Sequence, residues 1–348
     1  MSRTVARWTM GIALFAIAAF ALVGCGGTTA EVSSPWPVAN AERTIAEPPV
    51  PPRWPFTGRD AGADEDVTRR PLSVKIENSR PSRPQYGLNS ADVVYETIAE
   101  GGITRFNGIF HSKVPAKLGP VRSARLSDQW IVPQYDGLLF FSGRSRSVGQ
   151  TLAKHDIPVL EHGRIPRAYY RVSDRSAPHN LMLNTDKAVE EAEKKGRRMT
   201  AEVTPLKYER ASEETTPSVS RIDIPFSTYN KVRWEYDEDS GRFLRFNDGN
   251  VHRDAASGKQ VSANNVVVMW AKYTEAKNDK VGSVTWDINL GGEGKVSVFK
   301  DGNRYDGTWK ADRSAPPTFF DENGEPIKLT VGRTWFQVIP KDVKIKVK

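Results

Sequence analysis

The sequence has almost no cysteine, since Cys25 is the only one among 348 residues. A single thiol cannot form an intrachain disulfide and cannot supply the cysteine pairs of a zinc-thiolate site. The fold therefore has to be stabilised by a packed core.

Histidine is also scarce, and the chain lacks the common catalytic motifs that use it. No H-x-H or H-E-x-x-H spacing occurs, so the sequence gives no support for zinc. A hydrolase triad could be assembled on paper from Ser123 or Ser142 and His179. Asp174 would be its acid, but the chain has no G-x-S-x-G nucleophile elbow. The five histidines are His111, His155, His162, His179 and His252.

Long apolar runs are absent except at the N-terminus, where WTMGIALFAIAAFALVG follows two arginines. This arrangement is typical of a secretory signal peptide. The alternative is an uncleaved membrane helix, for which the run is short. The letters LVGC at Leu22–Cys25 then resemble the lipobox of bacterial lipoproteins. That resemblance implies a signal peptide at residues 1–24 and a mature chain that begins at Cys25.

In the lipoprotein class the cysteine thiol carries the lipid, so the resemblance also excludes thiol catalysis at Cys25. At least two acyl chains are attached in that class, which is enough for stable anchoring. We therefore expect the membrane as one partner, with the protein on the outer face of the cytoplasmic membrane.

Residues 25–66 are predicted to form the lipidated cysteine and a disordered tether. After Cys25 the stretch has little periodic apolar pattern and is rich in proline, with seven in 41 residues. A coil of this length spans roughly 35 Å. The folded part is thus expected to stand off the membrane.

Residues 67–210 alternate strand-like and helical patterns. Strands are predicted at 71–78 (PLSVKIEN) and 103–110 (ITRFNGIF), and helices at 147–155 (SVGQTLAKH) and 185–198 (TDKAVEEAEKKGRR). This alternation predicts an N-terminal α/β layer domain.

Residues 211–348 place Asp, Asn and Gly turns between β-branched and aromatic runs, which predicts a mostly antiparallel β domain. The whole fold is therefore predicted to be of the α+β class. The turn DGNRYDG resembles a calcium loop, but Asp306 stands where an EF-hand needs glycine, so turn chemistry is favoured. The domain holds five tryptophans, which could pack the core or form a platform for sugar rings. They are Trp234, Trp270, Trp286, Trp309 and Trp335.

The chain is basic, with a formal net charge of +8, and the excess is concentrated in residues 101–180. That region has twelve Lys or Arg against five Asp or Glu. Outside the membrane the expected anions are phospholipid headgroups, lipid-linked phosphates or anionic envelope polymers, and no nucleic acid is expected. The alternative is a solvated surface with a general basic bias.

The motif GPVRSAR places Arg122 and Arg125 three residues apart behind a Gly-Pro turn. If the segment turns helical there, both side chains share one face, and their guanidinium groups suit phosphate or carboxylate. We expect these two arginines to form an anion clamp, with Arg105 as support. Ser123 and Asp128 are polar candidates for the same site.

Acidic partners for this clamp are predicted in the preceding strand segment, because residues two or four apart in a strand share a side. The candidates are Asp92, Glu96 and Glu100. Carboxylates beside arginines are also the makeup of a structural ion-pair network, and this alternative stays open. The motif APHN adds His179 and Asn180, the histidine either as a loop residue that pins its own backbone or as an acid–base group.

Several longer motifs carry a family resemblance. The chain is similar to the YerB-like putative lipoproteins of Gram-positive bacteria over about residues 70 to 340. The resemblance implies two domains and an envelope location, and it supplies no reaction. It rests on the stretches RPLSVKIENSRPSRPQYGLNSADVVYETIAEGGITRF, LGPVRSAR, APHN, VHRDAASGKQVSANNVVV, DGTWKA and GRTWFQVI.

Together these patterns favour a binding or scaffold protein of the cell envelope, with no cofactor and with a further protein as an open partner. An enzymatic role is left uncertain. The alternative is an enzyme that acts on a polyprenyl-(pyro)phosphate-linked polymer in the manner of LytR-CpsA-Psr phosphotransferases, which share residue types and compartment with this chain. Mg²⁺ is a candidate cofactor only under that alternative, with Glu96 or Asp92 as candidate ligands.

Overall fold

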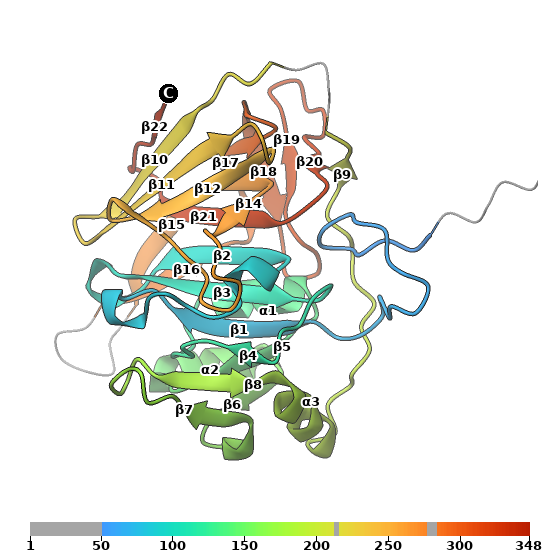
Figure 1. The fold of residues 1–348 in the computed structure, drawn as a ribbon, viewed down its shortest axis with the longest axis vertical. Coiled ribbons are helices and arrows are strands. Elements are labelled where there is room, and N and C mark those ends of the chain that lie inside the picture. Colours follow the sequence, from blue (N-terminus) through green and yellow to red (C-terminus); the bar gives the residue numbers. More distant parts are fainter. Residues whose placement is uncertain (1–50, 212–215, 277–283) are drawn as a thin grey trace, which may run out of the picture. The chain divides into compact units, whose positions relative to one another are not determined.

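The computed structural model describes residues 51–211, 216–276 and 284–348. The predicted signal peptide, the lipobox and Cys25 lie outside the described residues. Strands dominate the described part (Figure 1), and its three α-helices are short. These are α1 (Asp128–Gln134), α2 (Arg146–Lys154) and α3 (Thr185–Lys194).

The main sheet of the described residues is mixed and has eleven strands. Its order is β19 (Thr318–Phe320), β18 (Asn303–Ala311), β17 (Gly292–Lys300), β15 (Asn265–Ala276), β21 (Thr334–Pro340), β2 (Val93–Ile98), β3 (Thr104–Phe110), β1 (Leu72–Glu77), β5 (Leu138–Phe141) and β6 (Val159–Glu161), with β16 (Thr285–Asn289) paired to β15. Strands from both halves of the chain thus belong to one sheet.

A second sheet packs against one face of the first (Figure 1). Trp234 of the second sheet and Trp335 of the first meet edge to face, with ring centroids 5.1 Å apart. The second sheet has the order β13 (Asn250–Val251), β12 (Arg242–Asn247), β11 (Asn230–Asp237), β10 (Arg221–Ser227) and β22 (Lys346–Val347), with β14 (Ser262–Ala263) paired to β12.

Two small sheets complete the described part. One joins β4 (Lys117–Leu118), β8 (Leu181–Asn184) and β7 (Tyr169–Arg171), and the other pairs β9 (Tyr208–Glu209) with β20 (Leu329–Thr330). Helices α1 and α2 cover the opposite face of the main sheet near β5, where Val132, Val148 and Leu152 pack on Leu139 and Phe141.

The predicted mixture of strands and a few helices is confirmed, but the N-terminal half does not form an α/β layer of its own. Strand β21 pairs in parallel with β2, with Val93 opposite Thr334. Tyr95 and Phe336 stack across this pair, with ring centroids 4.4 Å apart. The described residues accordingly belong to one compact unit.

The predicted tether extends too far into the folded part. Trp54 and Phe56 are buried, and the Trp54 indole donates a hydrogen bond to Glu65 Oε2 at 3.0 Å. Phe56 packs edge to face on Tyr135, with ring centroids 4.8 Å apart. The prediction of a disordered tether was wrong for residues 51–66. The prolines of this stretch flank Trp54 and Phe56, and the side chains of both are buried.

The tryptophans of the C-terminal half pack mainly inside the protein. Trp234, Trp309 and Trp335 are buried almost completely, and Trp270 is 7% exposed. The core interpretation is confirmed for these four, whereas Trp286 is half-buried beside Tyr273.

Candidate functional site

Strand β1 is buried on both faces, and its two faces differ in polarity. Leu72, Val74 and Ile76 belong to the hydrophobic core, and the alternate positions carry Lys75 and Glu77. The antiparallel register with β3 places Glu77 opposite Arg105 and Lys75 opposite Asn107. A polar strip therefore crosses the sheet on the face that α1 covers.

The segment 120–124 fills the gap where the carboxyl ends of β1 and β5 diverge. Glu77 N donates to Pro120 O at 2.9 Å, and Arg122 N donates to Lys75 O at 2.9 Å. On the other side Ser142 N donates to Arg122 O at 3.0 Å. The segment after the Gly-Pro turn is therefore not helical, because its backbone bonds to strand ends, and α1 begins only at Asp128. The condition under which Arg122 and Arg125 would share one helix face is not met.

The inserted segment lies at an edge of the mixed sheet where three parallel strands end. Strands β1, β5 and β6 are parallel, so their carboxyl ends share one edge of the sheet. Ligands in open α/β sheets bind outside the carboxyl ends of the strands. The inserted segment delivers its arginines to this edge.

Three arginines meet there, and we name them, together with Glu77 and Glu100, the arginine cluster. Arg122 Nε lies 3.4 Å from Glu77 Oε2, and Arg125 Nη2 pairs with Glu100 Oε1. Arg105 Nη2 lies 3.8 Å from Glu100 Oε2. The three arginines and Glu100 thus lie together in this structure, and their role as an anion clamp stays a prediction.

Arg105 is the unusual member of the cluster. Its side chain is buried, and among the described residues its Nε and Nη1 have no hydrogen-bond partner. Burial and the neighbouring charge of Arg125 lower the pKa of Arg105 to about 9, against the attraction of Glu100 and Glu77. A buried cation with free donors is costly unless an anion comes to it.

Lys75 and Asp128 form a buried support beneath the cluster. Asp128 Oδ1 accepts from Lys75 Nζ at 2.7 Å and from Asn107 Nδ2 at 3.0 Å. Asp128 Oδ2 accepts from the backbone N–H of Arg125 at 2.7 Å, which fixes the clamp segment. Burial lowers the pKa of Lys75, and the paired Asp128 opposes that shift. Asp128 thus positions Arg125 and faces away from solvent.

His179 joins the cluster through Glu77. Glu77 was not among the site residues predicted from the sequence, whereas His179 was. Glu77 Oε1 lies 2.9 Å from His179 Nδ1 and accepts from Ser79 Oγ at 2.7 Å. The histidine side chain thus faces a carboxylate and does not pin its own backbone. Glu77 could have been found from its place in the polar alternation of PLSVKIEN, since the same alternation places Lys75 on the same face of β1.

The remaining polar candidates hold loops. Asn180 Nδ2 donates to Val172 O at 2.9 Å and to Arg175 O at 3.0 Å. Ser123 Oγ donates to Ser142 O at 3.2 Å. Asn180 therefore shapes the loop that carries His179, and Ser123 ties the clamp segment to the end of β5.

Glu96 does not face the arginine cluster. It lies on the opposite face of β2, fully buried, where Arg245 Nη2 donates to both of its oxygens at 2.9 and 2.8 Å. Thr104 Oγ1 and Gln337 Nε2 also donate to it, at 2.6 and 3.0 Å. This carboxylate joins the two sheets.

Asp92 is also remote from the cluster, at the start of β2. Its Oδ2 accepts from the backbone N–H groups of His111 and Ser112 at 2.9 and 2.6 Å. Burial raises the pKa of Asp92 to about 6, against the effect of these hydrogen bonds. The expectation that Asp92 and Glu96 face the arginines was wrong. Glu96 lies on the other face of β2, and Asp92 lies just before the first residue of that strand.

Two findings concern metal binding and membrane-spanning helices. In residues 51–211, 216–276 and 284–348 no three His, Cys, Asp or Glu side chains are grouped so that they could hold a metal ion. No helix in the same ranges has the length and apolar character needed to cross a membrane.

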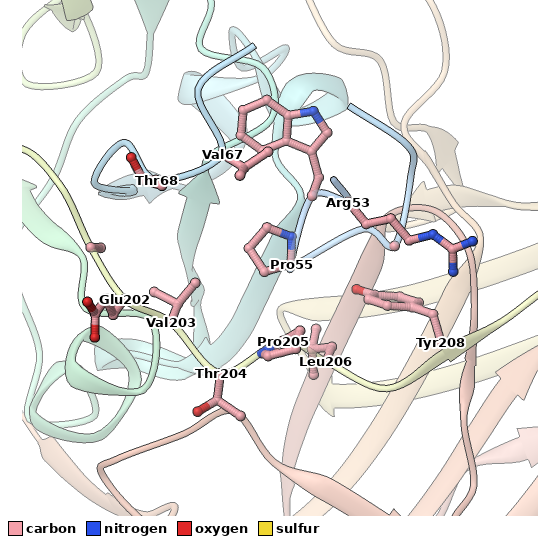
Figure 2. A pocket seen from close by; sticks show the side chains of 13 residues that line it. Arg53, Pro55, Val67, Thr68, Glu202, Val203, Thr204, Pro205, Leu206 and Tyr208 are labelled. Carbon is pink, nitrogen blue, oxygen red and sulfur yellow. The ribbon is translucent and has the colours of Figure 1, made fainter. Parts of the chain in front are cut away.

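A separate cavity of about 800 Å³ lies between the segment that begins at Arg53 and the chain near 201–208 (Figure 2). Trp54, Pro55 and Tyr208 contribute to its wall. Its lining includes none of the cluster residues.

Two family models match the chain. The N-terminal domain of a protein of unknown function (DUF3048) matches residues 56–198, and the C-terminal domain of the same family matches residues 222–336. The domain boundary that the sequence predicts near residue 210 falls between the two matched regions.

One similar curated protein is "Putative lipoprotein YerB" of Bacillus subtilis (strain 168), with 29% identity over 293 residues, 82% of this chain and 86% of that protein. A crystal structure of the YerB protein from Bacillus subtilis superposes with a TM-score of 0.76 at 28% identity. It covers 84% of this chain and 99% of that chain. The predicted resemblance to YerB-like lipoproteins is confirmed.

Proposed function

The chain belongs to the family described as DUF3048, proteins of unknown function, and from this premise we propose that it binds a phosphate-bearing anion at the arginine cluster. We propose a binding or scaffold role in the cell envelope. The observation that carries the proposal is the buried guanidinium of Arg105, whose Nε and Nη1 find no acceptor among the described residues.

The charge around Arg105 supports an anion. The cluster and its buried support together hold four cationic side chains and three carboxylates, so without a ligand they carry one excess positive charge. Repulsion from Arg125 and Arg122 contributes to the lowered pKa of Arg105, and an incoming anion would relieve it. The groups counted are Lys75, Arg105, Arg122 and Arg125 against Glu77, Glu100 and Asp128.

The donor geometry favours phosphate over a single carboxylate. N–H groups without a hydrogen bond come from three guanidinium groups, since Nε of Arg122 and Nε of Arg125 also make none in the described part of the chain. Arg122 Nε does lie 3.4 Å from Glu77 Oε2 as an ion pair. Phosphate has several acceptor oxygens and suits planar guanidinium forks. The ion-pair alternative accounts for Arg125 and Glu100, but it leaves Arg105 without a hydrogen-bonded carboxylate.

We further propose that the chain is anchored by lipid at Cys25 on the outer face of the cytoplasmic membrane. The support is the lipobox-like LVGC and the likeness to a protein named as a lipoprotein. In that setting the phosphate would belong to an anionic envelope polymer or to a lipid-linked phosphate.

The phosphotransferase alternative loses its expected metal ligands. Glu96 is held by Arg245, and Asp92 lies at the far end of its strand. Binding without turnover is therefore the role that the arrangement supports best.

Calorimetric titration of the full chain with phosphate and pyrophosphate tests the proposal. We expect binding that weakens with salt and that Arg122→Gln or Arg125→Gln reduces about tenfold, as expected for a charge-assisted hydrogen bond of 1.5 kcal/mol. Arg70→Gln is the matched control, because Arg70 is 10% exposed and paired to Asp136, much as Arg125 is 12% exposed and paired to Glu100. Equal losses in all three variants, or release of phosphate from pyrophosphate, would contradict a specific non-catalytic site.

A further inference from the structure

Two hairpin turns of the second sheet, at 228–229 and 248–249, lie at the same end of that sheet. The first turn joins β10 to β11, with Ser227 opposite Asn230. The second joins β12 to β13 and lies beside the start of β11, because Asp248 N donates to Lys231 O at 2.8 Å and Lys231 N donates to Asp248 Oδ1 at 3.0 Å. We name these two turns, with the loop 80–84 beside them, the turn end.

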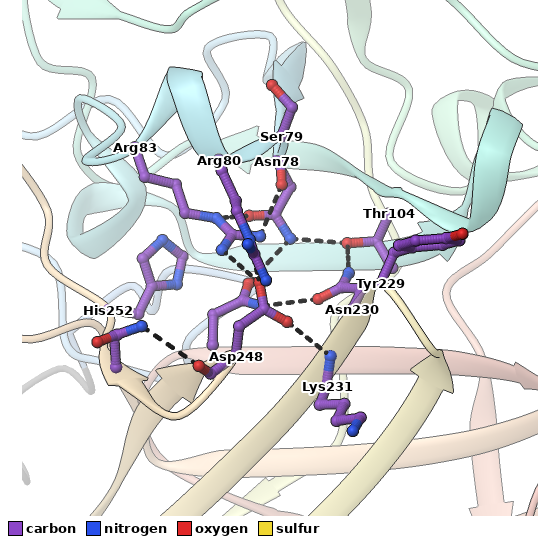
Figure 3. A network of polar contacts seen from close by, with 12 residues as sticks. Asn78, Ser79, Arg80, Arg83, Thr104, Tyr229, Asn230, Lys231, Asp248 and His252 are labelled. Atoms are coloured by element: carbon purple, nitrogen blue, oxygen red, sulfur yellow. Dashed lines mark hydrogen bonds and ion pairs between the residues drawn. The ribbon is translucent and has the colours of Figure 1, made fainter.

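The loop 80–84 is fixed to the two turns by arginine. Arg83 Nη1 lies 2.8 Å from Asp248 Oδ2, and Arg83 Nε donates to Asn78 Oδ1 at 3.1 Å. Figure 3 shows Arg80 and Arg83 extending from the loop toward Asp248, and the Lys231 side chain pointing away from the network of amides. The turn end is therefore one connected piece of structure.

Exposed apolar side chains are concentrated at the turn end. The described residues have three large apolar side chains that are exposed, and two of them are Tyr229, at 71%, and Val251, at 43%. The turn that carries Tyr229 is held in place, since Ser227 Oγ accepts from Tyr229 N at 3.0 Å and donates to Gly102 O at 2.6 Å. An aromatic side chain that is held on a fixed turn and still open to solvent is suited to an external surface.

Cationic side chains surround these two apolar ones. Arg80 is 78% exposed, and its Nε lies 3.7 Å from Asp248 Oδ2, beyond hydrogen-bond distance. Lys231 and Arg253 are exposed as well. Two depressions of about 390 Å³ and about 380 Å³ share Arg80 and Arg83, and Asp248 is the only carboxylate among the described residues that line them. The turn end is therefore positively charged.

The turn at the opposite end of the second sheet has the other sign of charge. It joins β11 to β12 and carries Asp237, Glu238 and Asp239 in succession. An anionic surface would attract the turn end and repel this acidic turn. The charges of the second sheet thus favour one orientation on such a surface.

We propose that the turn end docks on an anionic membrane surface, with Tyr229 in the headgroup layer and Arg80, Lys231 and Arg253 on the lipid phosphates. Tyrosine suits this layer because its ring is apolar and its hydroxyl is polar. Long basic side chains keep their charge among the headgroups while their stems cover apolar surface. A side chain on a turn reaches a deformable lipid surface without a fitted pocket. No residue of the arginine cluster lines either depression, so this contact is separate from the proposed anion site.

Co-sedimentation of residues 51–348 with lipid vesicles tests the inference, since this part contains the compact unit and lacks Cys25. We expect binding to vesicles of equal parts phosphatidylcholine and phosphatidylglycerol that weakens with salt, and little binding to phosphatidylcholine alone. Arg80→Gln and Lys231→Gln should each weaken it about fivefold, the effect of one basic residue near an anionic membrane. Tyr229→Ala should weaken it as well, whereas Tyr229→Trp should retain it.

The matched controls are Lys194→Gln and Tyr170→Ala, since Lys194 is 55% exposed on α3 and Tyr170 is 39% exposed on β7. Neither should change vesicle binding. Absence of binding to the anionic vesicles, or equal losses in the controls, overturns the inference. Vesicle binding that falls with Arg122→Gln and not with Arg80→Gln also overturns it, because the contact would then belong to the arginine cluster. Calorimetry with phosphate tests that cluster separately, so either claim can fail alone.

Discussion

At the scale of single residues, two buried arginines have opposite surroundings. Arg245 donates to both oxygens of Glu96, whereas Arg105 Nε and Nη1 lack acceptors throughout the described residues. An arginine paired this way holds a fold together, and one without acceptors is suited to an anion that arrives later.

The lowered pKa of Arg105 predicts a proton uptake on binding. With a pKa of about 9, the free guanidinium is partly deprotonated at pH 9, and a bound phosphate favours the charged form. Phosphate binding at pH 9 should therefore take up protons, and the affinity should fall as the pH rises further.

Calorimetry of phosphate binding in buffers of different ionisation enthalpy measures this uptake. Arg105→Met should remove the uptake at pH 9 together with most of the binding. An observed heat that does not depend on the buffer at pH 9 would show that Arg105 is not the group that titrates.

At the scale of elements, the alternation of polar and apolar residues predicted where strands lie. It did not predict which segments pair with one another. PLSVKIEN, ITRFNGIF and SVGQTLAKH became β1, β3 and α2. The sequence left open whether the segment 120–124 is helical, and its hydrogen bonds go to the ends of β1 and β5. Local periodicity carries no information about such distant acceptors.

The same limit applied to the site residues. The arginines and Glu100 are close in sequence and could be grouped from it. Glu77 and His179 are about a hundred residues apart and meet only because the loop around His179 folds onto the end of β1.

The contact between the two sheets gives a stability prediction. Glu96→Gln leaves Arg245 as a buried charge without its carboxylate, so the free energy of unfolding should fall by about 3–5 kcal/mol. Replacing both residues by leucine should recover much of that loss, since a buried pair exchanged for apolar side chains is often neutral. Urea unfolding of the single and double variants checks it, and equal losses in both would show that the pair's other hydrogen bonds dominate.

At the scale of the whole molecule, composition suggested two separate domains, and the two family models divide the chain in the same way. The main sheet nevertheless runs through both halves, with β21 between β15 and β2. The N-terminal half alone would expose the edge of β2, and the C-terminal half alone would expose the edge of β21. The apolar residues beside each edge would be exposed with it.

This continuity predicts the behaviour of separate halves. Residues 51–210 and 211–348 produced alone should fold poorly, and produced together they should assemble into one soluble complex. Circular dichroism and size exclusion of each half and of the pair measure this. Two independently cooperative melts would contradict a shared sheet.

The central claim is that Arg105 is a buried cation held ready for an anion, and the thermal melt of Arg105→Met with and without phosphate tests it most directly. Without phosphate the variant should be at least as stable as the wild type, because a desolvated charge that has no hydrogen-bonded acceptor is removed. Phosphate should raise the melting temperature of the wild type in a concentration-dependent way and leave the variant unchanged. A variant that melts far below the wild type without phosphate, together with a wild type that phosphate does not stabilise, would contradict the claim.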